Sequence, residues 1–260
     1  MIVWRYENTG LRSGVFNMEY DETLARRLLT GEGIPTLRLY GWDPPAISLG
    51  WNQRADEVAV ERAAAAGIDI VRRPTGGRAI LHSDELTYSV VMRVRGKNIM
   101  SVYDDISRAL VEGLHTLGAD VAIEKAQAHF PSLYKTASAV ACFSSSARYE
   151  IKHRGRKLVG SAQRRYAAED GSDVVLQHGS ILLGPDHLRM VEFLRCDRDD
   201  VRNRLREELI EKTTDLSAVL GRRALFDETA DAIRRGFESA WGITFETPVS
   251  IVHEPCQAAQ

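Results

Sequence analysis

Cysteine is scarce in this chain of 260 residues, which has only Cys142, Cys196 and Cys256. An odd number of cysteines at such wide spacing provides neither a disulfide framework nor the paired ligands of a zinc site. A disulfide-stapled secreted domain and a zinc finger are therefore excluded. We expect a reducing, cytoplasmic environment, in which a lone cysteine is either inert or a nucleophile.

Long hydrophobic runs and charge of one sign are missing as well. No apolar stretch approaches the roughly 20 residues that span a bilayer. The first six residues, MIVWRY, alternate like a strand and lack the apolar centre of a signal peptide. Because 34 basic and 36 acidic residues leave a net charge of −2, no global field attracts nucleic acid or a membrane. We therefore expect neither as a partner.

The rest of the composition, 44% hydrophobic and 27% charged, is that of a globular chain with a sizeable core. Hydrophobic periodicity predicts antiparallel hairpins interleaved with helices, which is typical of an α+β fold with a mixed, largely antiparallel sheet and flanking helices. After Gly184-Pro185 the pattern becomes helical. We predict a first unit over residues 1–184 and a helical extension over 185–260 that packs on the same domain. Helices are expected at 16–29, 57–66, 101–117, 187–194, 201–212 and 227–241, and Ser101 and Asp104 form a capping box at the start of the third. Strands are expected at 4–8, 36–42, 46–51, 68–73, 86–94, 148–152, 157–164 and 174–183. The last strand is expected to break at His178-Gly179.

The most informative stretch is RRPTGGRAILH, residues 72–82, which places a double glycine among three arginines and a histidine. Gly76 and Gly77 carry no side chain and tolerate positive φ, so backbone N–H groups there can approach a ligand oxygen closely. Arg73 and Arg78 supply fixed positive charge beside them. The same stretch is also typical of a basic hairpin turn, and both interpretations stay open on this segment alone.

Cys142 stands in AVACFSSS, where small residues before the sulfur and serines after it leave room for a ligand. A buried structural cysteine is the alternative, although it more often lies in a run of valine, leucine and isoleucine. The thiolate is the nucleophilic form, and a free thiol has a pKa of about 8.5, so activation needs a nearby cation. Candidates are Lys157, Arg148 and His178. Lys157 stands at the entrance of the apolar strand LVGSA, where a solvated hairpin tip is the alternative.

Several ordered motifs together resemble the superfamily of lipoate–protein ligases and octanoyltransferases. They are Phe16-Asn17-Met18 with Asp21-Glu22, the glycine-rich stretch ending at His82, ELTYS at 85–89, GRKLVGSAQ at 155–163 and HGSILL at 178–183. The match extends from near the N-terminus to about Leu183. Because the motifs occur in order within one chain, the resemblance is far more specific than a lone pair of glycines.

Within that superfamily the chain is most similar to the octanoyltransferases of the LipM type, since Cys142-Phe143 is followed 15 positions later by Lys157. The resemblance implies the catalytic fold of biotin and lipoate ligases, over residues 1–184. It also implies transfer of an octanoyl group from acyl carrier protein to a lysine of a lipoyl domain, such as the glycine-cleavage H protein, in lipoate biosynthesis. A thioester on Cys142 would be the intermediate, Lys157 would favour the thiolate, and neither a cofactor nor a metal would be needed. The implied substrate-binding residues are Arg73, Gly76, Gly77, Arg78, His82, Ser161 and His178, of which both histidines are equally compatible with structural roles.

Such a reaction needs an apolar slot and a docking surface. Each buried CH₂ of the acyl chain is worth roughly 0.8 kcal/mol, and acyl carrier protein is acidic, so a basic surface would complement it. Candidate walls of the slot are Leu39, Tyr40, Trp42, Leu49, Ala79, Leu81 and Tyr88, although each is also a plausible core residue. Candidate docking residues are Arg148, Lys152, Arg154, Arg156, Arg164 and Arg165.

Two alternatives remain. An ATP-dependent lipoate–protein ligase is disfavoured because Arg78 stands where ligases usually have a third glycine, and because Cys142-Phe143-Ser144 stands where they carry an Asn-Asp pair for ATP and magnesium. A non-catalytic acyl-binding relative is the second alternative. The sequence leaves open whether the cargo is octanoyl or lipoyl.

Overall fold

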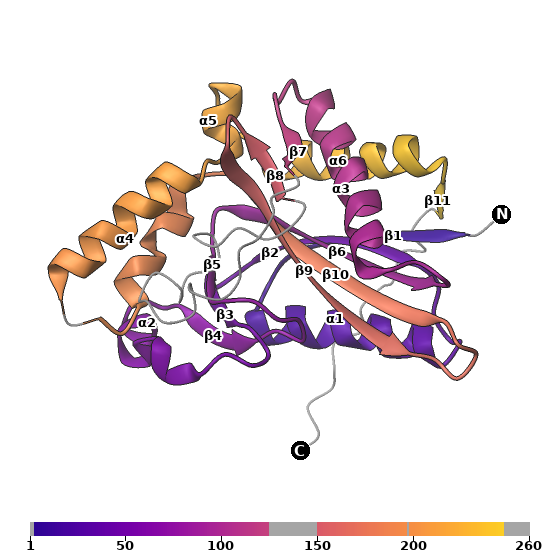
Figure 1. The fold of residues 1–260 in the computed structure, drawn as a ribbon, viewed down its shortest axis with the longest axis horizontal. Coiled ribbons are helices and arrows are strands. Elements are labelled where there is room, and N and C mark those ends of the chain that lie inside the picture. Colours follow the sequence, from indigo (N-terminus) through magenta and orange to yellow (C-terminus); the bar gives the residue numbers. More distant parts are fainter. Residues whose placement is uncertain (1–2, 125–149, 197, 247–260) are drawn as a thin grey trace, which may run out of the picture.

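The computed structural model describes residues 3–124, 150–196 and 198–246. In this part of the chain eight strands form one mixed sheet. β1 is parallel to both of its neighbours, β11 and β2, and the remaining pairs are antiparallel. The α+β prediction is therefore confirmed (Figure 1). In spatial order the strands are β11 (Phe245–Glu246), β1 (Trp4–Arg12), β2 (Thr36–Trp42), β6 (Glu85–Val94), β10 (Asp173–Leu182), β9 (Arg156–Ala167), β8 (Glu150–His153) and β7 (Ala122–Glu124).

A second sheet has three strands in the order β4 (Asp69–Arg72), β3 (Ala46–Leu49) and β5 (Ile80–His82). β4 and β5 flank the glycine-rich stretch, but both pair with β3 and not with each other. The hairpin interpretation of this stretch is therefore wrong. The chain crosses over the end of β3 instead, which leaves a loop between the two sheets.

α1 (Gly14–Leu29) covers one face of the large sheet and runs along its lower side in Figure 1. The Ser13 side chain caps the helix by accepting a hydrogen bond from the Phe16 N–H. Apolar side chains of the second half of the helix pack on β6 and β10, and Met18 in the first half packs on Tyr40, Trp42, Ala46 and Val71. Helix α1 therefore bridges the large sheet and the small one.

α3 (Ile99–Thr116) and α6 (Phe226–Trp241) pack closely on each other. A Cβ at Gly236 would meet the backbone of Ala109 and Gly113, so the crossing depends on the absence of side chains. The helix predicted from Ser101 begins earlier, because the Asn98 side chain accepts a hydrogen bond from the Ser101 N–H and serves as the cap.

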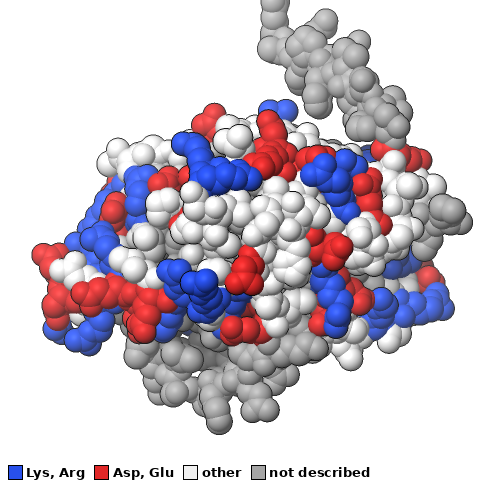
Figure 2. All heavy atoms as spheres, turned by 90° about the horizontal axis from the view of Figure 1, so that it is seen from above, with Lys and Arg blue, Asp and Glu red and all other residues white. Residues whose placement is uncertain are grey.

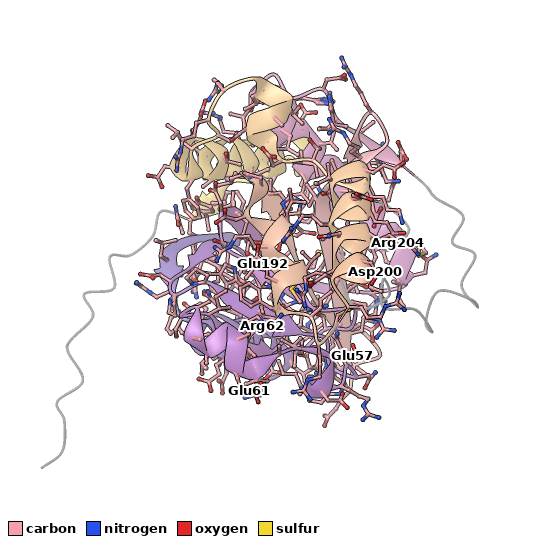
Figure 3. The ribbon with its side chains drawn as sticks, turned by 90° about the vertical axis from the view of Figure 1, so that its left-hand side faces the viewer. Glu57, Glu61, Arg62, Glu192, Asp200 and Arg204 are labelled. Carbon is pink, nitrogen blue, oxygen red and sulfur yellow. The ribbon has the colours of Figure 1, made fainter. Side chains whose placement is uncertain are left out.

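The segment after residue 184 consists of a 3₁₀ helix, η5 (Pro185–Phe193), followed by α4 (Asp199–Lys212), α5 (Leu216–Leu220) and α6. Its apolar residues, such as Phe193 and Leu209, belong to the same hydrophobic cluster as those of the large sheet. η5 lies against α2 (Val60–Ala65), where Arg62 donates a hydrogen bond to the Glu192 carbonyl at 2.5 Å (Figure 3). The division of the chain at residue 184 stays a prediction.

Two sequence-based boundaries are corrected by the structure. The helix expected at 57–66 is a 3₁₀ turn, η1 (Ala55–Glu57), followed by the short α2. The break expected in the strand at His178-Gly179 is wrong, because β10 pairs without interruption with β6 and β9. Gly179 is required for another reason, since a Cβ there would strike the Gly160 carbonyl of β9.

Charges are interspersed on the surface, and Figure 2 shows basic and acidic side chains alternating over one face of the molecule. This pattern agrees with the net charge of −2. None of the helices in the described residues combines the length and the apolar character needed to cross a membrane.

Candidate active site

A narrow cleft lies between the two sheets and α1. Its volume is about 30 Å³, room for roughly two water molecules. Apolar side chains and the bare backbone of Gly160 and Gly179 form much of its wall. The polar groups come from β3, β5, β6, β9 and β10 and from Arg73, which follows β4. The lining residues are Met18, Tyr40, Trp42, Ser48, Arg73, Ile80, His82, Thr87, Gly160, Ser161, Ala162, His178, Gly179 and Ser180.

His178 is held at one side of the cleft by two hydrogen bonds. Its Nδ1 lies 3.1 Å from Asp21 Oδ2 of α1, and its Nε2 lies 2.7 Å from the hydroxyl of Thr75 in the glycine-rich loop. Asp21 also accepts hydrogen bonds from Arg38 Nη1 at 2.8 Å and from the Tyr40 hydroxyl at 3.0 Å. The loop is thereby tied to both α1 and the large sheet.

The electrostatics of this group assign its protonation states. Burial raises the pKa of Asp21, but the Arg38 guanidinium and His178 outweigh it, so the pKa of this carboxyl lies below its usual value. Burial lowers the pKa of His178 in spite of Asp21. Burial and Asp21 raise the pKa of Tyr40 well above its usual value. At neutral pH Asp21 is therefore a carboxylate that accepts the Nδ1–H of a neutral His178, whose Nε2 accepts the Thr75 hydroxyl proton.

His82 forms a second hydrogen-bonded group in the cleft. Its Nε2 lies 2.7 Å from the Ser48 hydroxyl and its Nδ1 lies 2.8 Å from Glu85 Oε1. The Trp42 indole stacks on the imidazole at 4.0 Å and donates to the Thr87 hydroxyl, which in turn donates to Glu85 Oε1 at 2.6 Å. Trp42 and Thr87 thus hold both the plane of the His82 ring and the Glu85 carboxylate in place.

Arg73 is buried and organises the glycine-rich loop. Its guanidinium donates to the carbonyls of Ser48, Gly76 and Arg78 at 2.7 to 3.1 Å and to the Ser48 hydroxyl at 3.0 Å. Gly77 has a φ of 98°, and its carbonyl approaches Gly50 so closely that a Cβ at Gly50 would clash with it. The double glycine therefore shapes the loop through backbone freedom and close packing.

Lys157 is the second residue of β9 and is buried, with 4% of its surface exposed. Its Nζ lies 2.7 Å from Glu150 Oε1 of β8, which is buried as well. The interpretation of Lys157 as a solvated hairpin tip is therefore wrong, because its side chain is buried. A buried ammonium needs a close partner, since burying an ion pair is costly unless both charges are well partnered. Cys142 lies outside the described residues.

The structure distributes the predicted site residues over two places. Arg73, His82, Ser161 and His178 line the cleft, together with two of the predicted slot walls, Tyr40 and Trp42. Lys157 is not among the lining residues, and it lies four positions before Ser161 on β9, about 13 Å along the strand. Outside the lining are also Gly76, Gly77 and Arg78, the last with its guanidinium 3.5 Å from Glu57.

Sequence reasoning missed Ser48 and did not assign roles to Asp21 and Glu85. Ser48 is a polar residue within a strand that is otherwise apolar and wholly buried. Asn17 and Asp21 stand four positions apart on the buried face of α1. Polar residues at core positions of a strand or helix were therefore the available signal.

The basic cluster predicted as one docking surface is divided in the structure. Arg154 and Arg156 lie at the turn between β8 and β9, whereas Arg164 and Arg165 lie near the other end of β9, about 30 Å away. Lys152 is paired with Glu124 at 2.9 Å. A docking role for these residues stays a prediction, and Arg148 lies outside the described residues.

Comparison with known proteins places this architecture in a family. The family model described as the lipoyl protein ligase A/B catalytic domain matches residues 13–238. Among solved structures, a bipartite lipoate protein ligase from Thermoplasma acidophilum superposes with a TM-score of 0.77 at 22% identity, covering 95% of this chain and 87% of that one. A lipoate-protein ligase A bound with ATP superposes with a TM-score of 0.74 at 22% identity, covering 95% and 89%. At these identities the likeness shows the fold.

Relatives of higher identity are octanoyltransferases. The octanoyltransferase LipM of Kyrpidia tusciae is 40% identical over 265 residues, covering 100% of this chain and 94% of the relative. That of Symbiobacterium thermophilum is 40% identical over 260 residues, covering 99% and 93%. The family model and these relatives show that the chain belongs to the lipoyl protein ligase A/B catalytic family and, within it, to the octanoyltransferases of the LipM type.

Proposed function

We propose that this protein transfers an octanoyl group from octanoyl-acyl carrier protein to a lysine of a lipoyl domain, such as the glycine-cleavage H protein, in lipoate biosynthesis. The observation that carries the proposal is the 40% identity, over nearly the whole chain, to octanoyltransferases. The cleft supports it, because Met18, Tyr40, Trp42 and Ile80 give its lining the apolar character that an acyl chain requires.

The proposed transfer has two steps. The Cys142 sulfur attacks the carbonyl carbon of the donor thioester, a new C–S bond forms, and the carrier thiol leaves with its electron pair and a proton. The acceptor lysine then attacks the same carbon, and the C–S bond to Cys142 breaks. Each partner protein uses the site in turn, and no nucleotide is consumed because a thioester is already activated.

Lys157 is assigned the stabilisation of the Cys142 thiolate, as the family resemblance implies. An ammonium group held in a buried position is a strong partner for an anion, because the low local dielectric strengthens the attraction. Glu150 keeps the side chain of Lys157 in one place at 2.7 Å. Backbone N–H groups near Gly76, Gly77 or Ser161 are the candidates for stabilising the tetrahedral oxyanion.

The cleft must widen to take the acyl chain, since its present volume of about 30 Å³ is far smaller than eight carbons need. Met18 is the lining side chain best suited to move, because an unbranched thioether changes rotamer readily. An octanoyl chain that displaces Met18 would lie against Tyr40 and Trp42. Arg78 and the two cleft histidines remain candidates for contacts with the reacting end.

The test is intact-mass measurement after incubation with octanoyl-acyl carrier protein. The wild type should gain one octanoyl group that hydroxylamine removes, Cys142→Ser should gain none, and Lys157→Ala should acylate at least about 100-fold more slowly. Cys196→Ser is the matched control and should behave as the wild type, since Cys196 lies at the junction of η5 and α4, away from the cleft lining.

The competing function is an ATP-dependent lipoate–protein ligase. Octanoylation of H protein from free octanoate and ATP, with none from octanoyl-acyl carrier protein, would overturn the proposal in favour of the ligase. A non-catalytic acyl-binding protein would give no covalent adduct from either source.

A further inference from the structure

The side chain of Trp51 lies on the surface beside the glycine-rich loop. It is 51% exposed, whereas Trp4 and Trp42 are buried. Its backbone is held in place from two directions, because the Trp51 N–H donates to the Thr75 carbonyl at 2.9 Å and the Trp51 carbonyl accepts from Arg72 Nη1 at 2.9 Å. A large aromatic side chain is therefore presented to solvent from a fixed position.

The Arg164 guanidinium packs on the Trp51 ring. Its central carbon lies 4.7 Å from the centre of that ring and 5.0 Å from the centre of the half-buried Tyr166 ring. Arg164 Nη1 also donates to the Pro74 carbonyl of the glycine-rich loop at 3.0 Å. Tryptophan, tyrosine and arginine are the residue types that most often carry the binding energy of a protein–protein interface. We call Trp51, Arg72, Arg164 and Tyr166 the Trp51 patch.

The Trp51 patch carries an excess of positive charge. Arg72 forms no ion pair with another described residue, and Arg164 lies 3.9 Å from Glu22, which already pairs with Arg26 at 2.8 Å. Three guanidinium groups are thus balanced by one carboxylate. A single apolar side chain on a surface needs no explanation. An exposed aromatic side chain among uncompensated arginines, by contrast, is complementary to an acidic partner protein.

The Trp51 patch borders the cleft. Arg164 and the cleft residue Ala162 stand two positions apart on β9, so their side chains lie on the same face of the strand, about 7 Å apart along it. Thr75 connects Trp51 with the cleft as well, since its carbonyl accepts from the Trp51 N–H and its hydroxyl is hydrogen-bonded to His178. A protein bound to the patch would hold its acyl group beside the cleft.

We propose that the Trp51 patch is the docking site of the acyl carrier protein that donates the octanoyl group. This inference rests on the proposed function. Acyl carrier protein is acidic, and a surface with an excess of arginine complements it. Trp51 supplies a large apolar contact, while Arg72 and Arg164 attract the acidic surface around it and speed the encounter at low salt.

The experiment compares two octanoyl donors. Octanoyl-acyl carrier protein presents a protein surface, whereas octanoyl-N-acetylcysteamine is a small, uncharged thioester without one. With the carrier protein, Trp51→Ala should raise the KM at least about 10-fold and leave kcat within about twofold of the wild type. With the small thioester, the two proteins should form the octanoyl adduct at rates that agree within about twofold, because Trp51 is not a cleft residue.

The matched control is Leu225→Ala. Leu225 is 54% exposed and lines an open hollow beside β1, which three strands of the large sheet separate from β9. This variant should behave as the wild type with both donors.

Salt provides a second readout. Raising the NaCl concentration from about 0.05 to about 0.5 M should raise the KM of the wild type for the carrier protein and leave the reaction with the small thioester unchanged. Arg164→Gln should weaken this salt dependence, because one attracting charge is removed.

Three results would overturn the docking site. They are an unchanged KM of Trp51→Ala for the carrier protein, equal slowing with both donors, which indicates a structural role, and a raised KM for H protein alone, which assigns the patch to the acceptor. If Trp51→Ala fails to fold, Arg164→Gln takes its place and should show the same difference between the donors. Absence of any adduct from either donor in the wild type, by contrast, refutes the proposed function itself.

Discussion

At the scale of single residues, the buried charge of Arg38 is the feature that most needs a compensating partner. Both Arg38 and Asp21 are fully buried, and their ion pair is 2.8 Å long. The guanidinium also donates to the Asn17 side chain at 2.6 Å and faces the Tyr40 ring at 3.8 Å. The carboxylate is therefore what compensates this cation inside the protein.

We predict that Asp21→Asn lowers the free energy of unfolding by about 3–5 kcal/mol, because it leaves the guanidinium buried without a counter-charge. Urea denaturation at pH 7.5 measures the change. Glu22→Gln is the matched control on the next residue. Its pair with Arg26 is partly exposed, and we expect a loss of at most about 1 kcal/mol. Equal losses in the two variants would contradict this account.

The sequence singled out individual cleft residues better than their partners. Arg73 and His82, which line the cleft, stood out because of their chemistry and spacing. The contact between Asp21 and His178 joins positions 157 apart in the sequence, and no local pattern predicts such a pairing. The sequence therefore predicts only those cleft residues that belong to a recognisable local motif.

At the scale of elements, the periodicity of apolar residues predicted most strands and helices within a few positions. It succeeded for β2 (Thr36–Trp42) and β6 because half-buried and buried strands carry β-branched and aromatic residues between turn signals. It failed for β11 and α5, which are too short to show a period. Strand pairing, and with it the loop between the sheets, became visible only in the structure.

The close packing of α3 on α6 predicts the direction in which a Gly→Ala substitution changes the free energy of unfolding. A Gly→Ala change in an exposed helix interior stabilises a protein by up to about 1 kcal/mol. At Gly236 the added methyl group meets backbone atoms of Ala109 and Gly113, which cannot rotate away. We expect Gly236→Ala to lower the free energy of unfolding by about 1–3 kcal/mol in urea denaturation.

The control for this prediction is Ser239→Ala, an exposed position of the same helix, which should change stability by less than about 0.5 kcal/mol. A rise in stability for Gly236→Ala would show that the two helices are not in close backbone contact. Octanoyl transfer by the folded variant should be unchanged, since neither helix contributes a residue to the cleft.

At the scale of the whole molecule, stability should depend on pH through two buried histidines. Burial lowers the pKa of both His178 and His187 in the folded protein. An unfolded histidine titrates near pH 6.5. Below that pH the two histidines bind protons in the unfolded chain but not in the folded one, because burial has lowered their pKa. The free energy of unfolding therefore falls as pH decreases. Asp21, whose folded pKa is lowered, contributes in a different window, because its stabilisation is lost only below about pH 4.

Urea denaturation at pH 7.5, 6.5 and 5.5 measures the effect. Each histidine adds a slope of up to about 1.4 kcal/mol per pH unit below pH 6.5, so the wild type should lose stability steeply between pH 6.5 and 5.5 and little between 7.5 and 6.5. His187→Gln retains a donor for the Thr213 hydroxyl, which lies 2.7 Å from His187 Nε2, but it cannot titrate. Its slope should be about half that of the wild type. If the substitution left the slope unchanged, His187 would bind its proton equally well in the folded and unfolded states. Its burial in η5 against the end of α4 would then not cause the loss of stability at low pH.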